Sequence, residues 1–139
     1  MTASSTAPMR AHVDVALGDR SYGIDIGQGL LADAGGLIAP LLPRPQVCII
    51  TDDHVAETHL PALQAGLTAA GIASAALALP PGEGTKNMVE LTTAVEWLLE
   101  RKVERDDLII AFGGGVIGDL AGFAAAILRR GVGFVQIPT

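Results

Sequence analysis

The chain alternates short apolar runs with longer segments in which apolar residues recur every three or four positions. Residues 12–17 and 22–26 alternate polar and apolar side chains on either side of the turn-forming segment 18–21. This pattern predicts a β-hairpin at the edge of a sheet. Four further runs are rich in apolar residues and predict strands, the first of them typical of a parallel strand covered on both faces. They are residues 46–51, 72–79, 108–112 and 132–137.

Helical spacing of apolar residues predicts four helices between and after these strands, over residues 30–42, 55–70, 85–101 and 120–130. The third should turn one face to the core, formed by Met88, Leu91, Val95, Leu98 and Leu99. Strands and helices alternate strictly, and neither an internal repeat nor a linker interrupts them. The order therefore predicts an α/β fold with a mainly parallel sheet, an N-terminal hairpin, and ligands beyond the carboxyl ends of the strands.

Composition is consistent with one globular domain. Half of the 139 residues are hydrophobic, which is enough to bury a core, so we expect an α/β domain over residues 11–139 after a flexible tail over residues 1–10. The start of the chain has no apolar signal segment, and no eighteen apolar residues run together, so a cytoplasmic protein is expected. The single cysteine, Cys48, lies in an apolar run and should be a buried thiol.

Net charge narrows the choice of ligand. A formal charge of −6 gives no broad attraction for nucleic acid or for an acidic membrane, so neither is an expected partner. A ligand that carries phosphate would need donors placed locally.

The strongest candidate for such donors is the glycine-rich segment 113–119, Gly-Gly-Gly-Val-Ile-Gly-Asp, which joins a predicted strand to a helix. Consecutive glycines let a ligand approach the backbone closely, and a helix N-terminus attracts phosphate. The same residues also suit a tight connection with no ligand. The spacing is not the usual Gly-x-Gly-x-x-Gly, so an ordinary dinucleotide-binding fold does not follow from the glycines alone.

Three segments, taken in order, resemble the 3-dehydroquinate synthase family, a group of sugar-phosphate cyclases. Residues 113–126, followed by Arg130-Gly131-Val132 and Gln136-Ile137-Pro138-Thr139, are similar to that family's signature. Leu79-Pro80-Pro81-Gly82-Glu83-Gly84-Thr85-Lys86 resembles its Pro-x-Gly-Glu-x-x-Lys loop. Residues 50–54 resemble its Thr-Asp-x-Asn segment, with His54 where the family more often has Asn. The resemblance covers about residues 46–139 and implies a Rossmann-like NAD-binding domain.

The resemblance implies that NAD is bound by Asp52, Glu83, Lys86, Gly114, Gly115, Val116, Gly118, Asp119 and Thr139. The residues by themselves leave alternatives open. Asp52 could bind a ribose or cap the helix that follows it. Glu83 and Lys86 could pair with each other or divide a ribose and a pyrophosphate between them. Gly118 could let its helix approach either the sheet or the cofactor.

Arg130 is the one substrate-binding candidate. Arginine suits a phosphate dianion, although a cation near a helix end can also act on the helix dipole alone. By resemblance, Arg130 would reach the sugar phosphate in a neighbouring subunit of a homodimer.

The activity that the resemblance implies is conversion of 3-deoxy-D-arabino-heptulosonate 7-phosphate to 3-dehydroquinate and phosphate, in aromatic amino acid biosynthesis. It also implies zinc or cobalt held by a helical C-terminal domain, which is absent from this segment, as are all metal ligands and catalytic residues. The alternatives are a related cyclase of secondary metabolism, a metal-dependent polyol dehydrogenase, and a non-catalytic nucleotide-binding or interface module.

Overall fold

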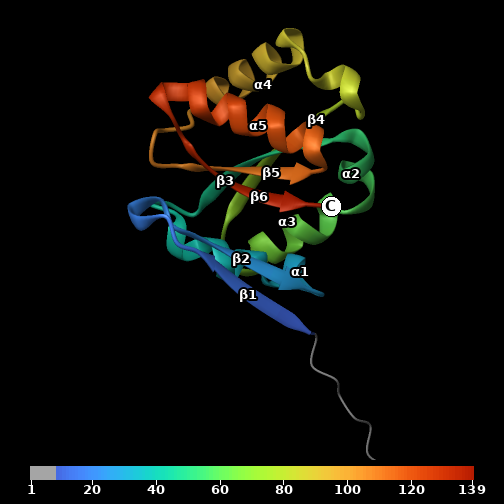
Figure 1. Ribbon diagram of the computed structural model, residues 1–139. Helices are drawn as coiled ribbons and strands as arrows, with labels where there is room; N and C mark the ends of the chain where they lie inside the picture. The colour runs from blue at the N-terminus through green and yellow to red at the C-terminus, as the bar shows by residue number, and fades with distance from the viewer. Residues whose placement is uncertain (1–8) are drawn as a thin grey trace, which may run out of the picture.

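The computed structural model describes residues 9–139 and shows a parallel sheet between two layers of helices (Figure 1). Of the tail expected over residues 1–10, residues 1–8 lie outside the described part, and Arg10 is already the first residue of a strand. In chain order the elements are β1 (Arg10–Val15), β2 (Tyr22–Gly27), α1 (Leu30–Ile38), β3 (Gln46–Asp52), α2 (Asp53–Thr58), α3 (Leu60–Ala69), β4 (Ala73–Leu79), α4 (Met88–Glu100), β5 (Leu108–Gly113), α5 (Gly115–Ile127) and β6 (Gly133–Pro138).

Strands β3 to β6 form one parallel sheet in the order β4-β3-β5-β6. Successive residues of its central strands face opposite helix layers. Ile50 and Ile109 pack with α4 and α5, whereas Ile49 and Ile110 pack with α1 and α3. All four are completely buried, because helices cover both faces. The predicted α/β fold with a parallel sheet is confirmed. None of the helices within residues 9–139 has the length and apolar character that a membrane crossing requires.

The N-terminal hairpin forms as predicted, but it is a separate two-stranded sheet and does not extend the edge of the large one. Its strands pair in antiparallel register, with His12 opposite Asp25. The His12 ring bonds Asp25 through Nδ1 at 2.8 Å and Asp14 through Nε2 at 2.7 Å. Hydrogen bonds to these two carboxylates raise the pKa of His12, Asp25 having the larger effect. The His12 ring therefore ties the two strands together across the polar face of the hairpin.

The first two predicted helices have different bounds in the structure. The helix expected over residues 55–70 is two helices, because His59 leaves helical geometry and Pro61 stands in the first turn of α3. Proline lacks the amide that a continuous helix would need at this position. The helix expected over 30–42 ends as α1 at Ile38 and continues only as a 3₁₀ turn, Ala39–Leu41.

The third helix starts later than predicted, since Asn87 caps α4 and residues Glu83–Thr85 form a 3₁₀ turn before it. Its buried residues are Leu91, Ala94 and Leu98. The prediction of a buried Met88 and Leu99 was wrong, because Met88 lies in the first turn, beyond the core, and Leu99 lies on the outer side of the helix; they are 71% and 44% exposed.

The last helix starts earlier than predicted, so that Gly115 is already helical and the glycine segment forms the first turn of α5. It also ends earlier, at Ile127. Arg129 and Arg130 follow in a 3₁₀ turn with left-handed backbone, φ 45° and 65°. These arginines therefore lie beyond the helix, in a backbone conformation that residues other than glycine seldom adopt.

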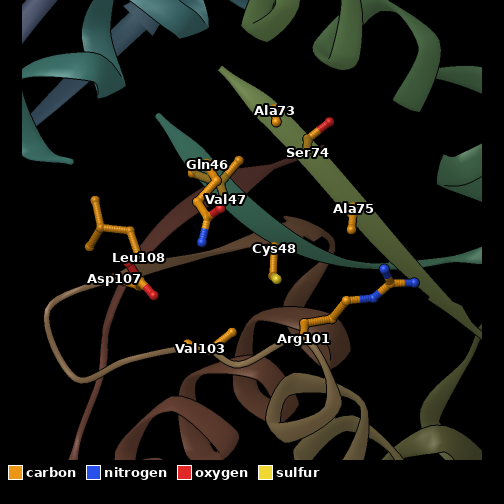
Figure 2. A pocket seen from close by; sticks show the side chains of 10 residues that line it. All are labelled: Gln46, Val47, Cys48, Ala73, Ser74, Ala75, Arg101, Val103, Asp107 and Leu108. Carbon is orange, nitrogen blue, oxygen red and sulfur yellow. The ribbon is translucent and has the colours of Figure 1, made fainter. Parts of the chain in front are cut away.

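The amino ends of β3 and β4 border a hollow of about 240 Å³ (Figure 2). Its sheet side is formed by small side chains, Cys48, Ala73 and Ala75, which leave space beneath the end of α4. Burial raises the pKa of the Cys48 thiol, as expected for an inert buried cysteine. Arg101 borders the same hollow, with its guanidinium 5.5 Å from the centre of the Trp97 ring.

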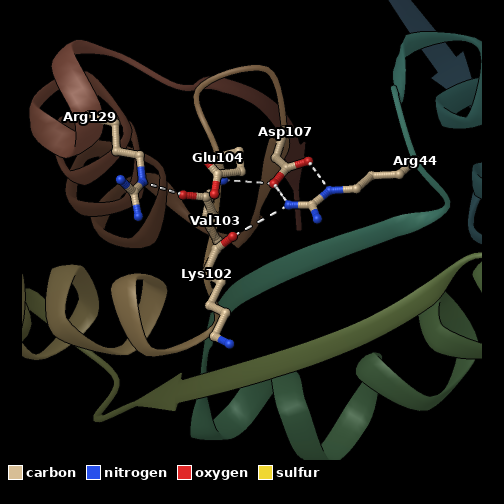
Figure 3. Close-up of polar contacts among 6 residues, drawn as sticks. All are labelled: Arg44, Lys102, Val103, Glu104, Asp107 and Arg129. Atoms are coloured by element: carbon tan, nitrogen blue, oxygen red, sulfur yellow. Dashed lines mark hydrogen bonds and ion pairs between the residues drawn. The ribbon is translucent and has the colours of Figure 1, made fainter.

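The connection between α4 and β5 is held by ion pairing and hydrogen bonds from both sides (Figure 3). The buried Asp107 carboxylate accepts from Arg44 Nε at 3.0 Å and Nη2 at 2.6 Å, and from the Glu104 amide at 2.8 Å. Arg129 Nε donates to the Val103 carbonyl at 2.7 Å. The Arg44 guanidinium, aided by the Glu104 amide, lowers the pKa of Asp107 despite its burial. This network sets where β5 enters the sheet.

Replacing Asp107 by asparagine should lower the free energy of unfolding by about 1–3 kcal/mol at pH 7, because a charged, bidentate acceptor is lost from a buried position. A group whose pKa is depressed by folding stabilises the protein above its unfolded pKa, and that contribution disappears as pH falls through the folded value. The deficit of Asp107→Asn should therefore begin to shrink below about pH 4, near the unfolded pKa, and shrink further as pH falls towards the lower folded pKa. Urea unfolding of the wild type and of Asp107→Asn from pH 3 to 7 measures this difference in the free energy of unfolding. Asp106→Asn, at an exposed neighbour, is the control; an equal loss there would contradict the assignment.

Candidate functional site

The carboxyl ends of β3 and β5 meet where the strand order reverses. From β3 the chain moves outward to β4, and from β5 it moves outward in the other direction to β6. The helices that follow β3 and β5 therefore diverge, which opens a crevice between them. A cleft of about 200 Å³ occupies this position. It is lined by Asp52, Pro80, Pro81, Gly82, Gly114, Gly115, Val116 and Ile117.

The N-terminus of α5 opens onto this cleft without a capping side chain. Its N-cap residue is Gly114, whereas α2 and α4 are capped by the side chains of Asp52 and Asn87. The first amides of a helix have no partner within the helix, and the helix dipole places partial positive charge there. This end of α5 is therefore suited to bind an anionic group from the cleft.

The glycines of the segment have two different roles. A Cβ built on Gly114 or Gly115 would meet nothing within 4 Å, so the absence of side chains there leaves backbone open to the cleft. A Cβ on the buried Gly118 would collide with the side chain of Gln136 in β6, and the Gly118 amide is already bonded to the Gly114 carbonyl. Of the two alternatives left open for Gly118, the structure places it against the sheet.

Asp52 acts as a helix cap and also lines the cleft. Its Oδ1 accepts a hydrogen bond from the Val55 amide at 2.8 Å, at the start of α2. The second carboxylate oxygen, Oδ2, has no hydrogen bond among residues 9–139. The two functions proposed for Asp52 are therefore compatible, because one oxygen stabilises the helix and the other is left for a ligand hydroxyl.

The loop after β4 forms the opposite wall of the cleft. Its shape is held internally, since the Thr85 hydroxyl donates to the Pro80 carbonyl and Asn87 Nδ2 donates to the Gly84 carbonyl. Gly82 has φ 98°, a conformation suited to glycine. Sequence reasoning recognised this loop as a motif but assigned a role only to Glu83 and Lys86. It missed the lining segment 80–82, although its position after a strand end was a signal for it.

Lys86 joins the loop to α5. Its Nζ lies 2.8 Å from Asp119 Oδ2 and 4.0 Å from Glu83 Oε2. The hydrogen bond and charge of Asp119, and then the charge of Glu83, raise the pKa of Lys86. The sequence suggested a pair between Glu83 and Lys86, but the closer partner is Asp119, which is far away in sequence. Three of the predicted site residues are thus brought together beside the cleft.

Thr139 and Arg130 lie at opposite ends of the last strand. The Thr139 amide donates to the Gly113 carbonyl at 3.2 Å, which places Thr139 next to the glycine segment. Arg130 lies beyond the far end of α5, a helix of 13 residues that spans about 20 Å. The structure therefore gathers the cofactor candidates at one end of the sheet and leaves Arg130 at the other.

Metal ligands are not gathered in this part of the protein. Within residues 9–139, no three His, Cys, Asp or Glu side chains lie close enough to hold a metal ion. The hollow at the amino ends of the strands is somewhat larger than the cleft, but it lies at the opposite end of β3 from the open helix terminus. The cleft is therefore the candidate functional site. A parallel sheet whose strand order reverses at the cleft, where a helix N-terminus is left open, defines a Rossmann-like α/β domain.

Comparison with known proteins shows which proteins this chain resembles. Residues 76–139 match the family model described as 3-dehydroquinate synthase N-terminal. The chain is 62% identical over 131 residues to the 3-dehydroquinate synthase of Ruegeria pomeroyi, covering 94% of this chain and 35% of that protein. The chain is thus similar to 3-dehydroquinate synthases, and it spans about a third of the length of the curated relatives it matches.

Solved structures share the fold. A 2-deoxy-scyllo-inosose synthase superposes with a TM-score of 0.82 at 24% identity, over 93% of this chain and 36% of its own. The 2-epi-5-epi-valiolone synthase of Streptomyces hygroscopicus, solved with NAD+ and Zn2+ bound, superposes with a TM-score of 0.75 at 28% identity, over 89% of this chain and 34% of its own. Both relatives are cyclitol-forming synthases by name.

Proposed function

We propose that this chain is the NAD-binding part of a 3-dehydroquinate synthase. The observation that carries the proposal is the uncapped N-terminus of α5, which meets open space at Gly114 and Gly115 where the strand order reverses. A pyrophosphate fits such a terminus because it accepts several backbone hydrogen bonds and complements the helix dipole. The 62% identity with a relative of that name supports the choice of activity.

Each cleft residue has a defined part in this proposal. The free Oδ2 of Asp52 accepts a hydrogen bond from the adenosine ribose, while Oδ1 keeps α2 capped. The amides at the start of α5 hold the pyrophosphate, and Val116 packs against the nicotinamide side. Glu83, Lys86 and Asp119 border the phosphates, and Thr139 extends the site along β6. Gly118 contributes indirectly, by letting α5 lie close to β6.

Bound NAD would supply a reversible acceptor for hydride from a carbinol carbon of the heptulosonate phosphate substrate, and it would be restored when that carbon is reduced again, before the carbocycle closes. The residues described here bind and orient it, and shield one side of it from water. No metal step is assigned to them, because residues 9–139 do not present a set of metal ligands. The proposed zinc or cobalt would be held by other parts of the full-length enzyme.

The proposal includes a cytoplasmic homodimer in which Arg130 serves the neighbouring subunit. Its support is positional: Arg130 is exposed, and Arg129 beside it is already bonded to the Val103 carbonyl. Two consecutive left-handed residues cost about 1–3 kcal/mol each, and such strain is often retained at functional positions. An exposed arginine held in this way could bind a phosphate on another molecule.

Gly115→Val tests NAD binding directly. The valine side chain would fill space that the pyrophosphate needs, and we expect the Kd for NAD to rise at least tenfold, or about 1.4 kcal/mol. The fold should tolerate the change, because nothing in the protein lies within 4 Å of the new Cβ. Gly36→Val is the matched control, since Gly36 is also an exposed helical glycine facing open space. Equal affinities by calorimetry for the wild type and a folded Gly115→Val would refute the proposed site.

The 139-residue chain by itself should show no cyclase activity, even with added zinc or cobalt. The reason is that its described residues bring no metal ligands together. Inorganic phosphate released from 3-deoxy-D-arabino-heptulosonate 7-phosphate, in the presence of NAD, is the measurement. Release above that of a blank would show that the chemistry lies in residues assigned here only to binding.

Arg130→Ala in a full-length enzyme should raise the KM for the sugar phosphate while the Kd for NAD stays near its normal value, because only a phosphate contact is lost. Mixing this variant with Gly115→Val should restore activity. In a hybrid dimer, one site combines an intact cleft with the intact Arg130 of its partner, which predicts about a quarter of wild-type activity after random exchange.

Arg105→Ala, an exposed arginine near the same end of the sheet, controls for the loss of positive charge. If verified hybrid dimers recover no activity, Arg130 serves its own subunit or has only a structural role.

A further inference from the structure

The charges around the cleft are arranged in an unusual way for a phosphate site. No lysine or arginine is among the residues that line it, and its one charged lining residue is Asp52. Lys86 stands beside the cleft, but Asp119 holds its Nζ at 2.8 Å and Glu83 lies at 4.0 Å. The carboxylates of Asp52, Glu83 and Asp119 outnumber the single ammonium group of Lys86, so the surroundings of the cleft carry net negative charge. A phosphate ligand is therefore held mainly by backbone amides.

Asp119 controls how much of the positive charge of Lys86 reaches the cleft. It lies four residues after Gly115, which is about 6 Å along the axis of α5 and one turn from the open terminus. The Asp119 and Lys86 side chains are 65% and 44% exposed, so the pair is accessible to a ligand and is not required to fill the core. As long as this pair persists, Lys86 offers a bound phosphate little net attraction.

We propose that Asp119 is a specificity-determining residue, which by holding Lys86 makes the cleft select a dinucleotide pyrophosphate over a nucleoside triphosphate. The inference rests on the proposed NAD function and deepens it. Backbone amides can bind the pyrophosphate of NAD, but the terminal phosphate of ATP brings about two further negative charges. While Asp119 holds Lys86, no free cation offsets those charges, and the nearby Glu83 carboxylate repels them. Such selection keeps ATP from competing with NAD for the cleft.

Asp119→Asn is the direct test, because it removes one negative charge and preserves the size of an exposed side chain. The Kd for NAD+ and the inhibition constant of ATP as a competitor would be measured at constant ionic strength, without divalent metal. We expect the preference for NAD+ over ATP to fall at least fivefold, with NAD+ affinity changing much less. Asp106→Asn removes the same charge at the opposite end of the sheet and should leave the preference unchanged.

Lys86→Gln shows whether Asp119 acts through the lysine. In that background, adding Asp119→Asn should change the preference by less than twofold, because there is no ammonium group left to release. A full fivefold effect in the Lys86→Gln background would overturn the inference, since Asp119 would then repel the ligand by itself.

The remaining outcomes separate this inference from the function on which it rests. If Asp119→Asn binds NAD+ normally and its preference over ATP stays within twofold of wild type, Asp119 does not set specificity, and the NAD site still stands. If the folded wild-type protein binds neither nucleotide, the proposed NAD function fails and this inference fails with it.

Discussion

The pairing of β3 with β5 creates the candidate site. Cys48, Ile49 and Ile50 pair in parallel with Ile109, Ile110 and Ala111, so two segments about sixty residues apart run side by side through the core. All of these positions are buried, and shifting the register by one residue would turn each apolar side chain to the wrong helix layer. The paired strands end together, at Asp52 and at the glycine segment. Because the helices after them diverge, a cleft forms at this place without any specially shaped insertion.

Function and helix stability make opposite demands at the start of α5. A glycine at an N-cap costs a few tenths of a kcal/mol relative to serine, aspartate or asparagine, and a glycine within a helix costs about 1 kcal/mol relative to alanine. The connections from β3 to α2 and from β4 to α4 use such caps, Asp52 and Asn87. Here the chain has Gly114 and Gly115 instead, and buries Ile117 and Leu120 to anchor the helix. The lost capping is offset by packing, and the amides stay open to the cleft.

The far end of the sheet is organised differently. The buried Asp107 carboxylate forms an ion pair with the partly exposed Arg44, and Arg129 holds the adjoining connection through the Val103 carbonyl. Polar groups at this end bond to one another, whereas Asp52 Oδ2 and the first amides of α5, around the cleft, have no hydrogen-bond partner among residues 9–139. This contrast is the physical reason to place ligand chemistry at the carboxyl ends of the strands, even though the hollow at the amino ends is larger.

The sequence by itself determined the order of elements, the parallel sheet and the position of the cleft, because apolar periodicity and glycines at strand ends are local signals. It also identified Asp52, Gly114 and Gly115, which follow strands directly. Tertiary structure alone decided that Lys86 pairs with Asp119, that Gly118 packs on Gln136, and that the cap residue Asp52 also lines the cleft beside Gly82 and Gly114. Each of these depends on how closely two distant segments approach one another. That distance is decided by packing between layers, which no pattern along one segment contains.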